Sequence, residues 1–354
     1  MREAVIVSTA RTGMGKSFRG ALNNTEAPAM GGHVVRAAVE RAGIGAAAQQ
    51  GTQAYNLGRL CAVAGGLPDS VPGMAIERQC SSGLMSIAWA AKSIMCNEMD
   101  IAVAGGLESI SLVQTKHKNS HRNVSQTVLD IDPTAYIPMI ETAEIVADRY
   151  GVSREAQDLY SLQSQQRVAA AQQAGLFADE IVPFKASMSV FNKETKETTF
   201  KDVLLEKDEC NRPTTTLESL SALEPVWKDG QWVKQGRFIT AGNASQLSDG
   251  ASACVVMDRK LAEQQGLAPL GLYRGLAVSG CKADEMGIGP VFAVPKLLKR
   301  AGLKVSDIGL WELNEAFAAQ VIYCRDQLGI DNDKLNVNGG AIALGHPIGC
   351  SGAR

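Results

Sequence analysis

The chain has 354 residues, of which 45% are hydrophobic and 20% are charged, and its formal net charge is −2. This composition is typical of a globular protein with two domains or one duplicated domain. The nearly balanced charge excludes the strong basic excess expected of a protein that binds nucleic acid or an anionic membrane. Because no targeting sequence precedes the first strand pattern and no apolar run is long enough to span a membrane, we expect a cytoplasmic protein.

Strand and helix patterns alternate along the first third of the chain, which predicts an α/β domain with a sheet buried on both faces. Residues 3–9 read as a strand and residues 31–42 as an amphipathic helix. A short buried strand over residues 71–79 leads into a helix over residues 81–95, and residues 100–104 form the next strand.

The middle of the chain has a different character. Residues 115–240 are more polar, with a long helical stretch at 153–175 and a charged segment from Asn192 to Arg212. We interpret this part as an insertion over the sheet domain. Regular α/β patterning resumes at Gly250.

Two helical segments resemble each other and suggest an internal duplication. Residues 34–44 read VVRAAVERAGI and residues 293–303 read AVPKLLKRAGL, each with a glycine at the helix stop. The second segment is followed by a strand pattern at 307–314. The first is followed by GAAAQQGTQAYN, which has no strand pattern, so a duplicated architecture would lack one strand after Ile44.

Eight cysteines are spread through the chain, and no C-x-x-C pair or Cys/His cluster indicates a metal site. We expect them to be reduced thiols. Cys80 differs from the rest because it lies where a strand meets a helix. The free N–H groups and positive dipole end of that helix would favour a nucleophilic thiolate. The alternative is a buried structural cysteine that packs as a small hydrophobe.

Three later segments carry polar residues in settings typical of binding sites. Residues 240–253 form a glycine- and serine-rich loop that enters a strand. Asn314 and Glu315 follow a buried strand at its carboxyl end, where α/β folds place ligands, although Asn314 could also cap a helix. His346 lies between Gly345 and Pro347 in a glycine-dense loop, which favours a site residue over a packed core histidine.

A cysteine at a helix start and a distant histidine in a rigid loop form an arrangement for thiolate chemistry. These residues alone do not distinguish a cysteine protease from an acyltransferase that forms a thioester.

The motifs taken together resemble the thiolase family, the acetyl-CoA C-acyltransferases. They are ARTGMGKSFRG (10–20), ERQCSSGL (77–84), AVAGGLESIS (102–111), TAGNAS (240–245), LNEAFA (313–318) and NGGAIALGHPIG (338–349). They span almost the whole chain in the family order. Ketoacyl synthases share the fold but have a different cysteine context and lack this pairing of NEAF with GHP.

The resemblance implies a role for each matching residue. Cys80 would take up the acyl group as a thioester, His346 would activate Cys80 and help to form an oxyanion hole, and Asn314 would position a water there. Five further positions would contact coenzyme A: Ala316 and Phe317 in the pantetheine tunnel, Ser245 at the pantetheine amide, and Arg212 and Ser219 at the nucleotide end.

The resemblance also implies a thiolase fold, in which duplicated βαβαβαββ units form αβαβα layers with an inserted loop domain. The N-terminal half would span 1–250, including the loop domain at about 112–240, and the C-terminal half would span 251–354. The substrates would be coenzyme A and acyl-CoA, with no metal and no tightly bound cofactor. A homodimer or homotetramer that works in fatty acid metabolism is expected.

Two features depart from the family pattern. The sequence ends at Arg354, before the second cysteine motif that supplies the acid/base of the carbon–carbon step, and Cys350 does not match that motif. The second departure is the absence of a strand pattern after Ile44, where family members have a strand. We therefore expect a thiolase that lacks its C-terminal end, able to acylate Cys80 but slow in carbon–carbon bond formation or cleavage.

Three alternatives remain open from the sequence. The chain could be an impaired paralogue that binds coenzyme A or acyl groups, which acylation of Cys80 would argue against. It could be a ketosynthase-like condensing enzyme, which would need a basic docking patch for a carrier protein. A cysteine hydrolase is disfavoured because no Asn or Asp lies in a recognisable setting to orient His346.

Overall fold

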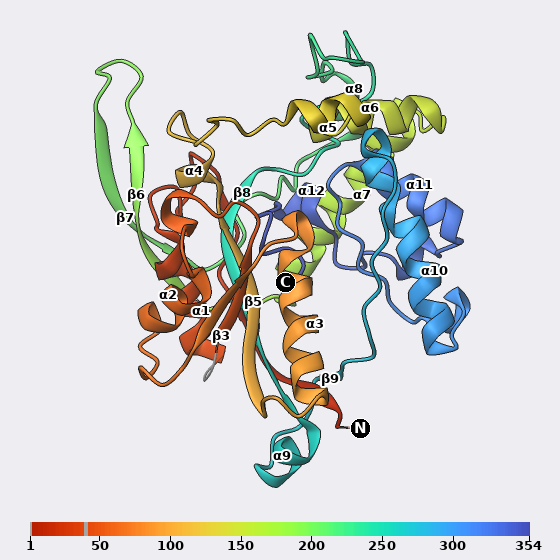
Figure 1. Cartoon of the computed structure of the whole chain (residues 1–354). Coiled ribbons are helices and arrows are strands. Elements are labelled where there is room, and N and C mark those ends of the chain that lie inside the picture. The colour runs from red at the N-terminus through yellow and green to blue at the C-terminus, as the bar shows by residue number, and fades with distance from the viewer. Residues whose placement is uncertain (1, 39–41) are drawn as a thin grey trace.

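A computed structural model describes residues 2–38 and 42–354, and its core is one mixed sheet (Figure 1). The strand order is β4-β3-β5-β8-β1-β9, and β2 also pairs with β8. The strands are β1 (Ala4–Arg11), β2 (Gly15–Lys16), β3 (Ala42–Ala46), β4 (Gly73–Ile76), β5 (Ile101–Ser109), β8 (Ser248–Asp258) and β9 (Gly271–Leu272). β3 runs parallel to β4 and β5, whereas β8 is antiparallel to β5 and β1.

Helices cover both faces of this sheet, as the buried strand patterns predict. Because successive strand residues point to opposite faces, Val103 and Leu107 of β5 pack in the cluster that contains helices α1 (Ala27–Ala38) and α2 (Leu57–Ala64). Ala102 and Ala104 pack instead with Ile94 of helix α3 (Ser82–Met95). Cys80 thus lies at the start of the helix that covers the second face.

The predicted insertion contains most of the elements at the top of Figure 1. They are α5 (Gln126–Ile131), α6 (Met139–Arg149), α7 (Arg154–Gln173) and α8 (Leu217–Ser221), and the short α4 (Ile110–Val113) precedes them at the end of β5. A hairpin of β6 (Phe184–Phe191) and β7 (Thr198–Leu205) projects beside them. None of the helices in the described ranges is long and apolar enough to cross a membrane.

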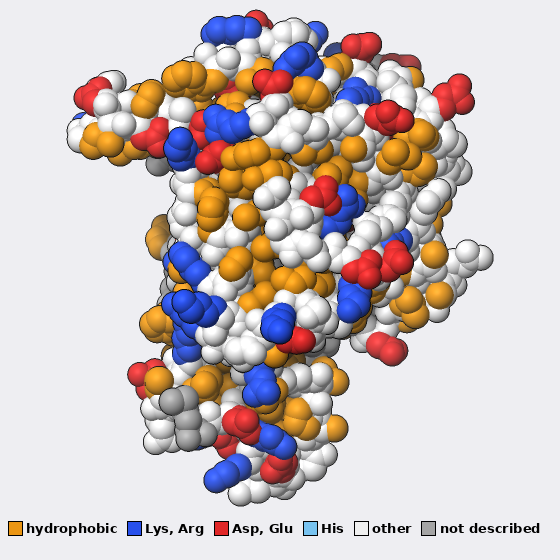
Figure 2. All heavy atoms as spheres, turned by 90° about the vertical axis from the view of Figure 1, so that its right-hand side faces the viewer, with side chains coloured by type: hydrophobic (Ala, Val, Ile, Leu, Met, Phe, Trp, Pro, Cys, Tyr) orange, Lys and Arg blue, Asp and Glu red, His pale blue; other side chains and the backbone are white. Residues whose placement is uncertain are grey.

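Helices are the main regular elements of the last hundred residues. These residues contain α9 (Arg259–Gln264), α10 (Gly289–Ala301), α11 (Ala318–Leu328) and α12 (Ala341–Leu344). α10 and α11 lie on the right of Figure 1, and that side of the molecule shows hydrophobic side chains between charged ones (Figure 2). The domain boundary predicted after residue 250 falls within β8, a single strand that spans Ser248–Asp258.

The prediction of a missing strand after Ile44 is wrong. β3 occupies Ala42–Ala46 and pairs with strands on both sides. Its residues, AGIGA, contain mostly alanine and glycine, which are depleted in strands, and a strand covered on both faces has no alternating pattern. The preceding helix ends at Ala38 rather than at residue 42, and residues 39–41 lie outside the described part.

The strand predicted at 307–314 does not join a sheet. Trp311 forms a single bridge with Leu335, and its backbone N–H and C=O bond to Lys334 and Asn336. The backbone hydrogen bonds of this extended segment therefore go to a neighbouring loop. The duplicated second sheet expected from the resemblance is not formed among the described residues.

The last residues of the chain lie beside α3, near the start of this helix; the label C marks the chain end in Figure 1. A Cβ built on Gly83 of α3 would lie 2.8 Å from Ala353 N and 2.9 Å from Gly349 O. A Cβ on Gly106 of β5 would meet Gly349 O and would lie 3.0 Å from Gly83 Cα. Three glycines therefore allow β5, α3 and the segment after His346 to touch backbone to backbone.

Replacing Gly106 with alanine tests this close packing. We expect Gly106→Ala to lower the free energy of unfolding by about 1–3 kcal/mol, because the added methyl group must displace backbone rather than a flexible side chain. Denaturant unfolding measures the change. Gly309→Ala is the matched control, since no atom lies within 4 Å of a Cβ built there. Equal stability of the two variants would contradict the proposed contact.

Candidate active site

Cys80 lies at the strand-to-helix junction that the sequence indicates. β4 ends at Ile76, a 3₁₀ turn spans Gln79–Ser81, and α3 begins at Ser82. The turn is fixed by its own residues: Ser82 Oγ accepts from Arg78 N at 2.8 Å and donates to Gln79 O at 2.7 Å. The thiol is thus carried on a rigid turn rather than on a free loop.

The expectation that Cys80 favours the thiolate in the resting protein is wrong. Burial raises the pKa of the thiol to about 11, and the negative charge of Glu108 raises it further, whereas a backbone hydrogen bond lowers it. Desolvation disfavours the charged form more than the helix start favours it. At neutral pH Cys80 is therefore a thiol that needs a base.

His346 is buried, and its backbone is held by the segment that leads into β8. Its backbone N–H donates to Gln246 O at 2.9 Å, and the residue forms a bridge with Leu247, next to the start of β8. Burial lowers the pKa of the imidazole to about 3, and the positive charge of Arg354 adds to this effect. His346 is therefore neutral at physiological pH and can accept a proton.

The hydrogen bonds of His346 identify the nitrogen that acts as base. Ser351 Oγ donates to Pro347 O at 3.2 Å and lies 2.6 Å from His346 Nδ1, so Nδ1 carries the hydrogen and Ser351 accepts it. Nε2 is then the unprotonated nitrogen, and it accepts from Asn314 Nδ2 at 3.4 Å. The unprotonated Nε2 faces the same space as the Asn314 amide.

Asn314 has an unused acceptor beside His346. Its Oδ1 atom is buried and has no hydrogen-bond partner among the described residues. An unpaired buried carbonyl costs about 1–3 kcal/mol. A water bound at this oxygen would remove that cost, and such a water matches the role that the resemblance implies for Asn314.

The structure brings three of the expected coenzyme A contacts to the Asn314 segment. Ser245 N donates to Ala316 O at 2.9 Å, and Ala244 bridges to Phe317. Ser245, Ala316 and Phe317 thus adjoin Asn314, whereas Arg212 and Ser219 are exposed on a separate segment around α8. Ser219 is already engaged there in the capping box of α8 with Thr216.

Two buried carboxylates lie beside the site: the sequence did not single out Glu108, and it indicated Glu315 only as a polar residue at a strand end, without a role. Glu108 Oε2 accepts from Gly349 N at 2.9 Å and from Ala47 N at 3.0 Å. Glu315 accepts from Ile342 N at 3.0 Å. Both residues lie within the recognised motifs, and a carboxylate within an otherwise apolar motif is the signal that could have singled them out.

The segment after His346 meets the first turn of α3, next to the turn that carries Cys80, through the contacts of Gly83 with Gly349 and Ala353. Within the described ranges, no group of three His, Cys, Asp or Glu side chains is arranged to hold a metal ion. The arrangement provides a buried thiol, a neutral imidazole and an amide whose Oδ1 has no partner among the described residues. This set suits acyl transfer through a thioester.

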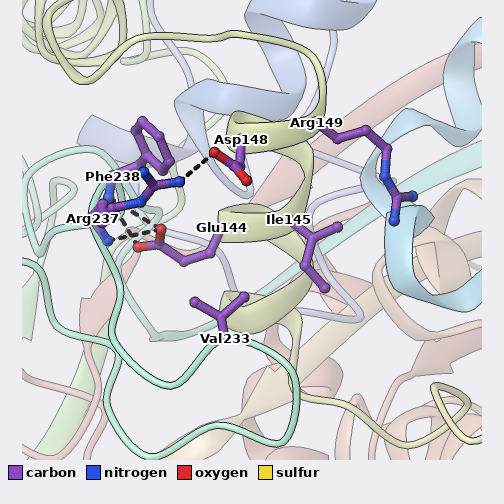
Figure 3. Close-up of a pocket in the computed structure, with 7 residues that line it drawn as sticks. All are labelled: Glu144, Ile145, Asp148, Arg149, Val233, Arg237 and Phe238. Atoms are coloured by element: carbon purple, nitrogen blue, oxygen red, sulfur yellow. Dashed lines mark hydrogen bonds and ion pairs between the residues drawn. The ribbon is translucent and has the colours of Figure 1, made fainter.

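A pocket of about 170 Å³ lies outside this site, between α6 and residues 233–238 (Figure 3). Its charged groups have partners of their own. Glu144 accepts from Arg237 N at 3.0 Å and Ile239 N at 2.8 Å, and the Arg237 guanidinium pairs with Asp148. None of Cys80, Asn314 and His346 lines it, so we assign it no part in catalysis.

The raised pKa of Cys80 can be tested by alkylation. In the substrate-free protein, the iodoacetamide reaction at Cys80 should accelerate about tenfold per pH unit between about pH 7 and pH 10, because only the thiolate reacts. Peptide mapping follows Cys80, and Cys80→Ser gives the background from the other cysteines. A rate that levels off below about pH 8 would show a thiolate-favouring site instead.

The comparisons with known proteins agree with this geometry. The family model "Thiolase, N-terminal domain" matches residues 4–260, and "Thiolase, C-terminal domain" matches residues 267–354. The 3-ketoacyl-CoA thiolase of Bacillus subtilis is 45% identical over 100% of this chain and 91% of its own length. The peroxisomal 3-ketoacyl-CoA thiolase B of Mus musculus is 41% identical over 99% of this chain and 82% of its own length.

A solved structure supports the same conclusion. The dimeric peroxisomal thiolase of Saccharomyces cerevisiae superposes with a TM-score of 0.85 at 35% identity, over 100% of this chain and 89% of that one. The predicted thiolase fold is thereby confirmed. The chain belongs to the thiolase family.

Proposed function

We propose that this chain is an acyl-CoA C-acyltransferase that works through a thioester on Cys80. The observation that carries the proposal is the unprotonated Nε2 of His346 beside the Asn314 amide, in a loop whose next residues pack against the start of α3, the helix that follows Cys80. The relatives named 3-ketoacyl-CoA thiolase support a degradative direction, in which coenzyme A cleaves a 3-oxoacyl-CoA in fatty acid β-oxidation.

The first step loads the acyl group on Cys80. His346 Nε2 takes the thiol proton, and the sulfur attacks the C3 carbonyl of the 3-oxoacyl-CoA. The oxyanion accepts hydrogen bonds from the imidazolium and from the water at Asn314. The C2–C3 bond then breaks, the acyl group stays on Cys80, and the leaving acetyl-CoA enolate takes up the proton that the His346 imidazolium holds.

The second step returns Cys80 to the thiol. The sulfur of a free coenzyme A attacks the thioester, the same donors hold the oxyanion, and the Cys80 sulfur leaves with a proton. Substrate binding has to favour transfer of the Cys80 proton to His346, because the resting site holds a thiol and a neutral imidazole. Acylation before entry of the second substrate gives ping-pong kinetics.

Coenzyme A and acyl-CoA are the proposed substrates, with no tightly bound cofactor. The proximity of Ser245, Ala316 and Phe317 to Asn314 supports their proposed contacts with pantetheine. Arg212 and Ser219 are proposed to meet the nucleotide end, where their exposure leaves them accessible. The yeast relative's structure is described as dimeric, and we propose a homo-oligomer, as a dimer or tetramer. The cytoplasm stays the predicted compartment.

The surroundings of His346 argue against a cysteine hydrolase. Its Nδ1 bonds to a serine hydroxyl, and no carboxylate among the described residues bonds to the ring. The matches to both thiolase models and to full-length relatives do not favour a ketosynthase-like enzyme or a binding-only paralogue.

Steady-state thiolysis of acetoacetyl-CoA by coenzyme A tests the proposal. Double-reciprocal plots at several coenzyme A concentrations should be parallel, and Asn314→Ala should lower kcat by about 10²–10³-fold through loss of the oxyanion donor. Cys80→Ser should be inactive, and the exposed His117→Ala is a control for His346→Ala. Intersecting plots, or full activity of His346→Ala, would contradict the mechanism.

A further inference from the structure

Glu315 is a buried carboxylate with four hydrogen-bond donors. Its Oε1 accepts from Tyr160 Oη at 2.9 Å and from Asn336 Nδ2 at 3.2 Å. Its Oε2 accepts from Ser164 Oγ at 2.7 Å and from Ile342 N at 3.0 Å. The carboxylate therefore joins the Asn314 segment to α7 and to α12.

These donors favour the ionised form of Glu315. Asn336 Nδ2 and Ile342 N can only donate, and the two hydroxyl oxygens already accept elsewhere, Tyr160 from Asn336 and Ser164 from Gly340 N. Burial raises the pKa of Glu315, and the donors counteract that effect. Both oxygens thus act as acceptors, and neither has room for an N–H group.

One set of contacts fixes Asn314. Asn336 donates to Glu315 and to Leu313 O at 2.8 Å, and its Oδ1 accepts from Leu313 N at 2.9 Å. The residues immediately before and after Asn314 are therefore both held by the Asn336 amide. Asn314 itself contacts His346.

A second set of contacts fixes His346. Ile342 lies in α12, which ends two residues before His346. A Cβ on Gly340, which precedes α12, would lie 2.7 Å from Glu315 Oε2, so the backbone reaches the carboxylate only because this residue is glycine. The α12 backbone and the Asn314 segment thus share one anchor.

We propose that Glu315 is a positioning residue, whose buried carboxylate sets the distance between Asn314 and His346 Nε2 by holding the backbone of both segments. This inference rests on the proposed function and extends it beyond the groups that touch substrate. Glu315 acts through the geometry of its neighbours, because its oxygens are occupied by the four donors.

Glu315→Gln tests the proposal in the thiolysis assay. The amide N–H would face two donors in either orientation, so the Asn314 and α12 segments should separate. We expect kcat to fall about 10–100-fold, the cost of a displacement on the order of 1 Å, with KM for coenzyme A within about twofold. Alkylation of Cys80 by iodoacetamide should keep the wild-type rate, because Cys80 itself does not move.

Asp258→Asn is the matched control for the loss of a buried carboxylate. Asp258 accepts from Arg2 Nε at 2.8 Å and Leu261 N at 3.1 Å, at the opposite end of β8 from the His346 loop. The Asp258→Asn substitution should lower the melting temperature of the protein without a change in kcat. Wild-type kcat in a folded Glu315→Gln protein would overturn the inference, and so would a similar loss of kcat in Asp258→Asn.

Two less disruptive substitutions test the same proposal if Glu315→Gln does not fold. Ser164→Ala removes one donor to Glu315, whereas Ser161→Ala removes an equally buried hydroxyl of α7 that bonds only to Gln157 O of its own helix. We expect kcat to fall about threefold in Ser164→Ala alone, in line with the loss of one hydrogen bond. Equal kcat in the two variants would overturn the inference, whereas an inactive wild-type protein would instead refute the proposed function.

Discussion

Close backbone packing between the segment after His346 and the start of α3 is the constraint on which the site depends. Gly83, Gly106 and Gly349 lie so near one another that a side chain on any of them would meet backbone atoms. This contact joins segments that are far apart in the sequence and packs the segment after His346 against the start of the helix that follows Cys80. The sheet supports it, because β5 presents Gly106 on the face that α3 covers, and Glu108 at the end of β5 accepts the N–H of Gly349. The packed sheet thereby fixes the position of the segment after His346.

Burial sets the protonation states of the reacting groups. It raises the pKa of Cys80 and lowers that of His346, so the resting site holds two neutral groups. A neutral pair costs less to bury than a thiolate and an imidazolium. In the proposed mechanism, charge develops only when an acyl-CoA is present, at the point where Asn314 would meet the oxyanion through a water. A site of this kind protects the thiol from other electrophiles at neutral pH, since only the thiolate is nucleophilic.

Local signals predicted the parts of the structure that depend on local sequence. The strand-to-helix junction at Cys80 and the burial of β5 followed from apolar spacing, and the motifs placed Asn314 and His346 in one site. The strand β3 could not be predicted, because AGIGA has no alternation and its stability comes from neighbours on both sides. The pKa of Cys80 depends on desolvation by distant segments, and the anchoring role of Glu315 depends on donors from α7 and α12. Neither could be inferred from the residues nearby.

Mapping the acyl group after incubation with an acyl-CoA tests the central claim most directly. The account predicts one acyl group on the peptide that contains Cys80, none on that peptide in Cys80→Ser, and its removal when free coenzyme A is added. Mass spectrometry of the digested protein reads all three results. An acyl group on a different cysteine, or no acyl group on the wild-type protein under conditions in which it turns over substrate, would contradict acyl transfer through Cys80.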